Sequence, residues 1–475
     1  MASIWCFLLL YALPRRAYAL GTSGTVESSY LQEERSFCGG GLHCYSSLLQ
    51  HNVAVSGSET TRAPAPRGPS IYVYPLPASL WINGSLVTFR DHKCANIPVN
   101  IPCDGRSDFC VFGKEVDVAL PGDDGGKLKV RDIFQFSLGR IFWASLLNHP
   151  RRTQNPHKAD LFYIPAFNTN VVRVDESKCA TAEQLVRQLP YLNNETAARH
   201  FWLASSTAWR TRTCEVFQSS LASASQAARL LARTTKMALE DRDSAPGNLT
   251  ADMEAGSEHS RGRTPPVAEN LHSIPYPAVT SGLDDEAVQA WMAYTTAPRK
   301  RQYLVSAVWA VHGLGSAVDL RTELTMQCQQ SPECLFQDLE DFLWQSVSFT
   351  ERVLPPKLKS TFCLEPTGDT PSRKGMADSI VAGCIPVLFN PLQAKLWPWH
   401  VGRWEDVSIL MAENATNDVI GLLSQVPEAE VERLRANMVR LVPRLTFALP
   451  GRPHAGDALE TALAAVLATA SESTA

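Results

Sequence analysis

The chain has 475 residues, with 44 Lys and Arg against 48 Asp and Glu, which gives a formal net charge of −4. This length leaves room for two or three domains, each with its own core, and the slight acidic excess argues against a general nucleic-acid-binding protein. No run of 18 apolar residues occurs, which argues against a chain that crosses a membrane repeatedly. A globular protein remains, and an enzyme is the favoured class.

The first 20 residues contain an apolar stretch from Ala2 to Leu13, which is followed by Arg15-Arg16 and by Ala17-x-Ala19. The stretch has the length of the apolar part of a signal sequence, and the two alanines fit a cleavage site. A short type II membrane anchor and a plain N-terminal segment are the alternatives. Residues 21–70 predict a stem or linker, because their second half is rich in Ser, Thr, Ala, Pro and Arg.

Cysteines and glycosylation sequons favour the secretory pathway. Twelve cysteines occur without a C-x-x-C pair, so we expect disulfides rather than a zinc site. Three pairs are close enough in sequence to form small loops: Cys38/Cys44, Cys103/Cys110 and Cys328/Cys334. Four N-glycosylation sequons are present, at Asn83, Asn194, Asn248 and Asn414.

The predicted elements alternate between strands and helices. In the first half they are a β-rich run at 71–77, a helix at 132–147, a strand at 159–165, a helix at 181–189 and a strand at 201–203. Residues 240–270 carry no apolar period and predict a disordered insertion. In the second half they are a resumption of order at 273–277, a strand at 303–309, a helix at 316–327 and a helical region at 417–467. This alternation predicts an α/β fold.

The stretch 361–389 is a strand, a loop, a helix and a strand. Thr361–Pro366 predicts a buried strand, and Thr370 followed by Pro371 is typical of a helix start. We expect the helix to end at Gly383 and the next strand to follow it. The predicted buried face of this helix consists of Met376, Ala377, Ile380 and Val381.

The start of this helix is a candidate anion site. A helix N-terminus presents free amide N–H groups and partial positive charge, so it suits a diphosphate. Arg373 lies in the first turn, where a cation is unfavourable unless an anion is bound. Lys374 would supply further charge, and Asp378 would accept hydrogen bonds from ribose hydroxyls. The alternative interpretation is a solvated Arg373 beside a surface ion pair four residues apart.

The segment Ser360–Gly375, continued by Ala382–Phe389, resembles the signature of exostosin-type glycosyltransferases, in particular the branch that includes plant xyloglucan galactosyltransferases. Weaker family-like pieces occur in the same order in the rest of 70–440. The resemblance implies a GT-B architecture, in which two Rossmann-like domains face each other across a cleft. The positions that match the family's nucleotide-sugar site are Gly368, Thr370, Ser372, Arg373, Lys374 and Asp378.

The resemblance implies domain limits as well. An acceptor-side domain would span 71–272 and a nucleotide-sugar-binding domain 273–465, with a flexible tail at 466–475. The family's Gly-Arg-Asp-His-Phe pattern is replaced by Ala197-Ala198-Arg199-His200-Phe201, so an acid is missing on the acceptor side. This departure leaves room for lost activity.

Transfer with inversion needs a base that deprotonates the acceptor hydroxyl, and the sequence offers His200 and Asp160 as candidates, each with a structural alternative. Trp399 and His400 are weak candidates for acceptor binding, because Trp397, Trp399 and Trp404 would form either a sugar platform or core packing. The motif Asp241-Arg242-Asp243 lies at the edge of the predicted insertion, so we expect no metal site and no tightly bound cofactor.

These observations predict a Golgi or secretory-pathway glycosyltransferase that moves a sugar from a nucleotide sugar, most simply a UDP-sugar, to a glycan acceptor. Nucleic acid is not expected as a partner. Membrane association through the N-terminus and a partner glycosyltransferase remain open. The alternative is a catalytically silent glycan-binding or scaffold protein that keeps the exostosin fold.

Overall fold

The structure is a computed structural model that describes residues 68–80, 111–121, 126–167, 179–205, 214, 216–240, 269–297, 299–311, 316–339, 349–368, 370–411, 413–454 and 456–472. The expected leader, nearly all of the expected stem and insertion, and the Asp241-Arg242-Asp243 motif lie outside these residues. So do the sequons at Asn83 and Asn248, the side chain of Asn414, and the pairs Cys38/Cys44 and Cys103/Cys110.

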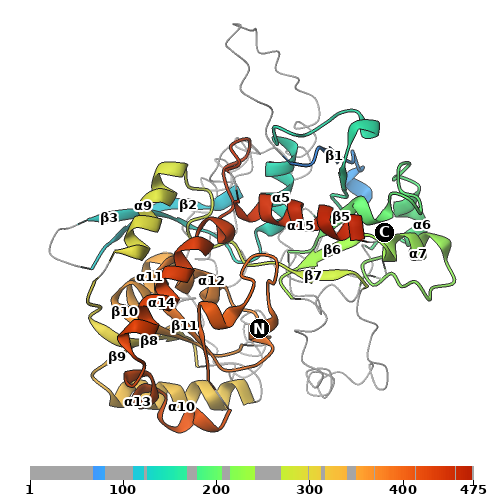
Figure 1. Ribbon diagram of the computed structural model, residues 1–475. Coiled ribbons are helices and arrows are strands. Elements are labelled where there is room, and N and C mark those ends of the chain that lie inside the picture. The colour runs from blue at the N-terminus through green and yellow to red at the C-terminus, as the bar shows by residue number, and fades with distance from the viewer. Residues whose placement is uncertain are drawn as a thin grey trace, which may run out of the picture.

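The described part of the chain contains two five-stranded parallel sheets (Figure 1). The first sheet has the order β1-β4-β5-β6-β7, and every neighbouring pair is parallel. Its strands are β1 (Ile71–Val73), β4 (Leu161–Tyr163), β5 (His200–Leu203), β6 (Thr235–Ala238) and β7 (Leu271–Ser273). Its helices are α5 (Leu138–Leu147), α6 (Ala182–Val186) and α7 (Gln226–Ala232).

The second sheet has the order β12-β11-β10-β8-β9. Its strands are β8 (Tyr303–Trp309), β9 (Cys334–Asp338), β10 (Ser360–Glu365), β11 (Ile385–Leu388) and β12 (Ile409–Leu410). Its helices are α9 (Asp285–Thr296), α10 (Ser316–Gln330), α11 (Phe349–Lys359), α12 (Lys374–Val381), α13 (Val419–Ser424) and α14 (Glu428–Met438). Strand β9 lies on one side of β8 and β10 on the other, so the strand order reverses between β8 and β10.

Short 3₁₀ helices connect several of these elements. They are Ala78–Leu80, Pro156–Lys158, Ala197–Arg199, Gln393–Lys395, Trp404–Asp406, Glu413–Asp418, Val439–Leu441 and Pro443–Leu445. The predicted α/β alternation is thus confirmed as a mixed α/β fold with parallel sheets, and β8 has the predicted bounds. The helical region predicted at 417–467 is interrupted, because residues 446–454, 456 and 457 are not helical.

We call the part of the chain that contains the first sheet the first half and the part that contains the second sheet the second half. Two segments of one half pack on the other half. The antiparallel hairpin β2 (Lys114–Ala119) and β3 (Lys127–Asp132), which was not predicted, packs on α11 and α9 of the second half. Helix α15 (Ala458–Glu472) returns to the first half (Figure 1), where Glu460 bonds to His149 at 2.8 Å and to Arg151. Both sets of contacts run across the predicted limit between 71–272 and 273–465, and residues 466–472 of the predicted tail belong to α15.

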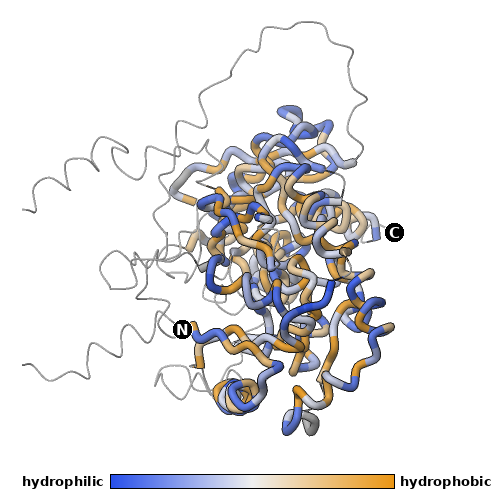
Figure 2. Tube along the Cα trace, turned by 90° about the vertical axis from the view of Figure 1, so that its left-hand side faces the viewer, coloured by the Kyte–Doolittle hydropathy of each residue, from blue (hydrophilic) through white to orange (hydrophobic). Residues whose placement is uncertain are grey.

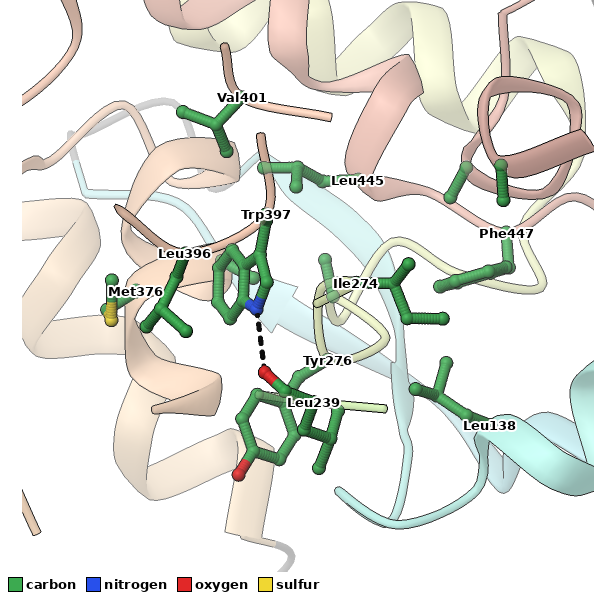
Figure 3. Close-up of a cluster of buried hydrophobic side chains, with 14 of the residues drawn as sticks. Leu138, Leu239, Ile274, Tyr276, Met376, Leu396, Trp397, Val401, Leu445 and Phe447 are labelled. Atoms are coloured by element: carbon green, nitrogen blue, oxygen red, sulfur yellow. Dashed lines mark hydrogen bonds between the residues drawn. The ribbon is translucent and has the colours of Figure 1, made fainter. Parts of the chain in front are cut away.

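The core is continuous between the two sheets. Figure 3 shows side chains from both halves around Trp397, including Leu239 after β6, Ile274 after β7 and Met376 of α12. The Trp397 indole N–H donates to the Leu239 carbonyl at 3.2 Å, and its backbone N–H donates to Ser273 Oγ at 2.9 Å. Trp397 and Trp404 are at most 1% exposed, so the core-packing interpretation holds for both.

Three disulfides join described cysteines. They are Cys179–Cys214, Cys328–Cys334 and Cys363–Cys384. The pair Cys328–Cys334 is one of the three whose close spacing allows a small loop. The disulfide Cys363–Cys384 links strand β10 to the residue just before β11, its neighbour in the sheet. It therefore joins the two ends of the predicted strand–loop–helix unit.

Hydrophobic and hydrophilic stretches alternate along the trace in both halves of the molecule (Figure 2). None of the helices in the described ranges is both long and apolar enough to span a bilayer.

Candidate functional site

The strand order of the second sheet reverses between β8 and β10, and in sheets of this kind a crevice lies outside the carboxyl ends of the strands at the reversal. In open parallel sheets, ligands bind at such a reversal, because the connections on its two sides run to opposite faces and leave room between them. The residues after β10 are 366–373, and the helix after β8 is α10. The predicted nucleotide-sugar residues therefore lie at the position where this kind of sheet binds ligands.

The start of α12 differs from the prediction. Its N-cap is Arg373, with φ −140° and ψ 136°, rather than Thr370. The Thr370 carbonyl instead accepts a hydrogen bond from the Gly368 N–H at 3.1 Å, and the Ser372 N–H donates to Glu240 Oε1 at 3.0 Å. These bonds keep residues 370–373 out of the helix. The C-terminal end was predicted correctly: Gly383 follows the helix with φ 66°, which favours glycine.

The buried face of α12 was predicted correctly, since Met376, Ala377, Ile380 and Val381 are all 0% exposed.

Two guanidinium groups converge on Gly368. A Cβ atom added to Gly368 would lie 2.7 Å from Arg373 Nη1 and 3.0 Å from Arg321 Nη2. Arg321 belongs to α10, is 5% exposed, and donates from Nη1 to the Ala310 carbonyl after β8 at 3.3 Å. The two arginines thus come from the two sides of the crevice, and the absence of a side chain at residue 368 makes room for both.

This arrangement suits an anion. Burial lowers the pKa of Arg373, with nearby Tyr276 acting in the opposite direction, so the site disfavours a bare charge. Among the described residues, no carboxylate lies within ion-pair distance of Arg373. Two neighbouring cations also repel each other. A bound phosphate would offset both effects through charge-assisted hydrogen bonds.

Lys374 and Asp378 form a buried ion pair instead of a surface pair. Lys374 Nζ bonds to the two Asp378 carboxylate oxygens at 2.9 and 2.8 Å, and the side chains are 7% and 1% exposed. Asp378 Oδ1 also accepts from the Val279 N–H at 3.0 Å. Both oxygens of Asp378 are therefore engaged inside the protein.

A second buried ion pair connects α12 to β10 and α11. Lys357 of α11 bonds to Glu365 at the end of β10 and to Ser379 Oγ of α12 at 2.8 Å. A Cβ at Gly375 would lie 2.4 Å from Glu365 Oε2, so only glycine fits where the helix crosses this carboxylate. The pair fixes the height of α12 above the sheet.

The two weak candidates for a catalytic base have structural contacts. His200 is 0% exposed, and its ring lies between the Tyr74 hydroxyl at 2.7 Å from Nε2 and the Thr196 carbonyl at 2.8 Å from Nδ1. Burial lowers the pKa of His200 to about 4. Asp160 Oδ2 accepts from the Ser70 N–H and Ser70 Oγ, both at 2.7 Å, which holds the chain where it enters β1.

The two candidates for acceptor binding, Trp399 and His400, follow the signature segment in the sequence. Trp399 is half-buried and stacks on His272 with the ring centres 4.3 Å apart. His400 is 0% exposed, and its Nε2 lies 3.0 Å from the Ala458 carbonyl at the start of α15. Burial lowers the pKa of His400 to about 4. Of the two side chains, only Trp399 is accessible to a sugar ring.

Sequence reasoning missed Arg321 and Glu240. Arg321 is one charged residue on a predicted helix with no motif around it, and Glu240 stands at the edge of the predicted insertion. Both come near the signature only through the tertiary fold. Within the described ranges, no group of three His, Cys, Asp or Glu side chains is arranged to hold a metal ion.

Comparison with known proteins matches the exostosin GT47 domain to residues 65–426. The chain is 27% identical over 359 residues to the xyloglucan-specific galacturonosyltransferase 1 of Arabidopsis thaliana, covering 74% of this chain and 48% of that protein. It is 27% identical over 346 residues to the probable xyloglucan galactosyltransferase GT17 of the same plant, covering 70% of each. A third relative, the xyloglucan galactosyltransferase MUR3, is 29% identical over 39% of this chain and 30% of its own length. The chain thus spans about half of the first of these relatives.

Proposed function

The chain belongs to the exostosin GT47 family, and from this premise we propose that it is a glycosyltransferase of GT-B architecture that transfers a sugar from a UDP-sugar to a glycan acceptor with inversion. The glycosyltransferase names of its relatives support the reaction class, and their xyloglucan substrates suggest a polysaccharide acceptor. The two parallel sheets support the architecture, with the second sheet as the nucleotide-sugar side.

One observation carries the donor site: the guanidinium groups of Arg321 and Arg373 meet at Gly368, at the crevice between β8 and β10. In the transfer, the acceptor oxygen forms a bond to the anomeric carbon while the bond to the diphosphate breaks. The leaving diphosphate gains negative charge, and two arginines at fixed positions stabilise it. They supply charge that a metal ion supplies in other transferases.

The other predicted residues contribute differently to this site. Gly368 provides the space, and Thr370 and Ser372 shape the loop through backbone bonds. Lys374 and Asp378 hold α12 in place, because their charged groups are paired inside the protein. The acceptor hydroxyl gives its proton to a general base.

A screen of UDP- and GDP-sugars by thermal shift tests the donor class. We expect UDP and at least one UDP-sugar to raise the melting temperature, since a ligand that binds only the folded state stabilises it. A GDP-sugar with a larger shift than any UDP-sugar would change the donor class. No shift with any nucleotide would contradict the donor site.

The silent glycan-binding protein remains a second candidate because of one observation. Arg199, which stands where the family has an acid, packs over the Phe162 ring at 5.4 Å, and the neighbouring His200 is enclosed. Hydrolysis of UDP-sugars without an acceptor separates the two candidates. A transferase releases UDP slowly, whereas a silent protein releases none.

The secretory pathway has its own test at Asn194. This residue is exposed, in a turn where Asn193 Oδ1 accepts from the Glu195 and Thr196 N–H groups. We expect protein from eukaryotic cells to shift on a gel after glycosidase treatment, and Asn194→Gln to remove part of the shift. Unglycosylated protein in the cytosol would contradict the secretory assignment.

A further inference from the structure

Glu240 connects the first sheet to the start of α12. It follows strand β6 and is 1% exposed, and Ser372, which is 3% exposed, lies two residues before α12. The Ser372 N–H donates to Glu240 Oε1 at 3.0 Å, and the Ser372 hydroxyl donates to the same oxygen at 2.6 Å. One carboxyl oxygen of Glu240 thus accepts both polar hydrogens of Ser372, which attaches the residues before α12 to the end of β6.

The neighbouring contacts make the attachment rigid. Leu239, just before Glu240, accepts the indole N–H of Trp397 at 3.2 Å (Figure 3). The Tyr276 hydroxyl lies 3.3 Å from Ser372 Oγ. The end of β6 is therefore bonded to the second half at two consecutive residues, and Ser372 is held on two sides.

Ser372 immediately precedes Arg373, whose backbone is extended where it caps α12. The direction of the Arg373 side chain therefore depends on how Ser372 is held. The amide and hydroxyl of Ser372, which the sequence suggested for the diphosphate, are occupied by Glu240. A donor phosphate at this crevice is then left to the arginines at Gly368.

We propose that Glu240 is a positioning residue for donor binding, an inference that rests on the proposed function. Its carboxylate holds Ser372 across the junction of the two sheets and so directs the Arg373 guanidinium towards Gly368 and the donor diphosphate. Glu240 acts through Ser372 and does not touch the donor itself.

Dissociation constants for UDP, measured by calorimetry on the full chain, test this role. Glu240→Ala should weaken UDP binding roughly tenfold, because a displaced cation loses much of its interaction with a fixed phosphate. Glu240→Gln keeps an acceptor oxygen for Ser372 and should remain within about threefold of the parent. Ser372→Ala, which loses only the hydroxyl bond, should fall between them.

Glu269→Ala is the matched control. Glu269 also receives a serine hydroxyl and a backbone N–H, from Ser220 at 2.8 Å and Leu221 at 3.1 Å, but within the first half. The Glu269→Ala variant should lose comparable hydrogen bonds to a carboxylate and leave the dissociation constant for UDP unchanged. If Glu240→Ala does not fold, the Glu240→Gln and Ser372→Ala variants and their double mutant still decide, because coupled residues give a non-additive change in UDP affinity.

The outcomes separate this inference from the proposed function. If Arg373→Ala weakens UDP binding while both Glu240 variants bind as the parent does, Glu240 is only structural and the inference is wrong. A lowered melting temperature of the Glu240 variants with an unchanged UDP constant contradicts the positioning role in the same way. A parent protein that binds no UDP contradicts the proposed function, and the positioning role with it.

Discussion

Asp378 of α12 and Val279, in the segment between the two sheets, are joined by a hydrogen bond of 3.0 Å from the Val279 N–H to Asp378 Oδ1. The Val279 carbonyl in turn accepts from the Arg131 N–H of the hairpin at 2.8 Å. Asp378 thus ties the helix of the proposed donor site to the connection between the halves.

Asp378→Asn should therefore lower stability. Lys374 would remain buried without its counter-charge, and breaking one side of a buried pair costs about 3–5 kcal/mol. Urea unfolding measures the loss. Adding Lys374→Met should recover part of it, because the unpaired charge is gone. Unchanged stability together with a large loss of UDP affinity would restore the ribose interpretation.

Arg373→Ala should weaken UDP binding about ten- to a hundredfold, the value of a charge-assisted bond to phosphate of about 1.5–3 kcal/mol. Stability should stay level or rise by a few tenths of a kcal/mol, because a cation at a helix N-terminus is unfavourable. Arg321→Ala should weaken binding to a similar extent. Calorimetry with UDP and thermal unfolding measure both quantities.

Arg299→Ala is the control for these two variants. Arg299 lies just before β8, at the amino end of that strand and so away from the carboxyl ends where the proposed site lies. Its guanidinium carbon is 3.5 Å from the centre of the Tyr294 ring. The Arg299→Ala variant removes a cation near the same sheet but outside the proposed donor site, so its affinity for UDP should not change. Equal affinity in the parent, Arg373→Ala and Arg321→Ala would place the nucleotide elsewhere.

His200 should make stability depend on pH. Burial lowers its pKa from 6.5 to about 4 in the folded state, so the unfolded chain binds more protons between these values. The contribution of His200 to the free energy of unfolding is fully present above pH 6.5 and is lost as the pH falls towards 4. The loss is on the order of a few kcal/mol. Asp457 acts in the opposite direction, because burial raises its pKa to about 7.

Comparison of variants isolates the histidine from Asp457. His200→Gln should show a shallower fall of melting temperature between pH 6.5 and 4 than the parent, while exposed His157→Gln should follow the parent curve. Parallel curves for the parent and His200→Gln would mean that His200 keeps an ordinary pKa.

The disulfide Cys363–Cys384 should stabilise more than Cys328–Cys334, because it closes a longer loop. The sequence separations are 21 and 6 residues. Loop-closure entropy gives about 3 kcal/mol for the longer and about 2 kcal/mol for the shorter. Chemical unfolding of the two double-alanine variants measures these values. A larger loss for the 328/334 variant would show that loop length is not the controlling factor.

Local patterns were sufficient to predict the strand–loop–helix–strand unit, since turn residues, apolar runs and Gly383 act within a few residues of one another. The start of α12 was misplaced because Glu240, which is 132 residues away from Ser372, holds the loop extended. The ion pair of Lys374 and Asp378 was predicted as a spacing, but its burial depends on Val279 and the hairpin. Arg321 could not be predicted, because nothing local distinguishes it from a surface arginine.

Helix α15 also bears on the order of events during synthesis. Protein chains emerge from the ribosome N-terminus first, and early domains usually fold while later ones are still being made. Here Glu460 supplies the bonds to His149 and Arg151 of the first half, and the Ala458 carbonyl accepts from His400. The first half therefore lacks these bonds until α15 has been translated, so it completes its native contacts only after the second half has been made.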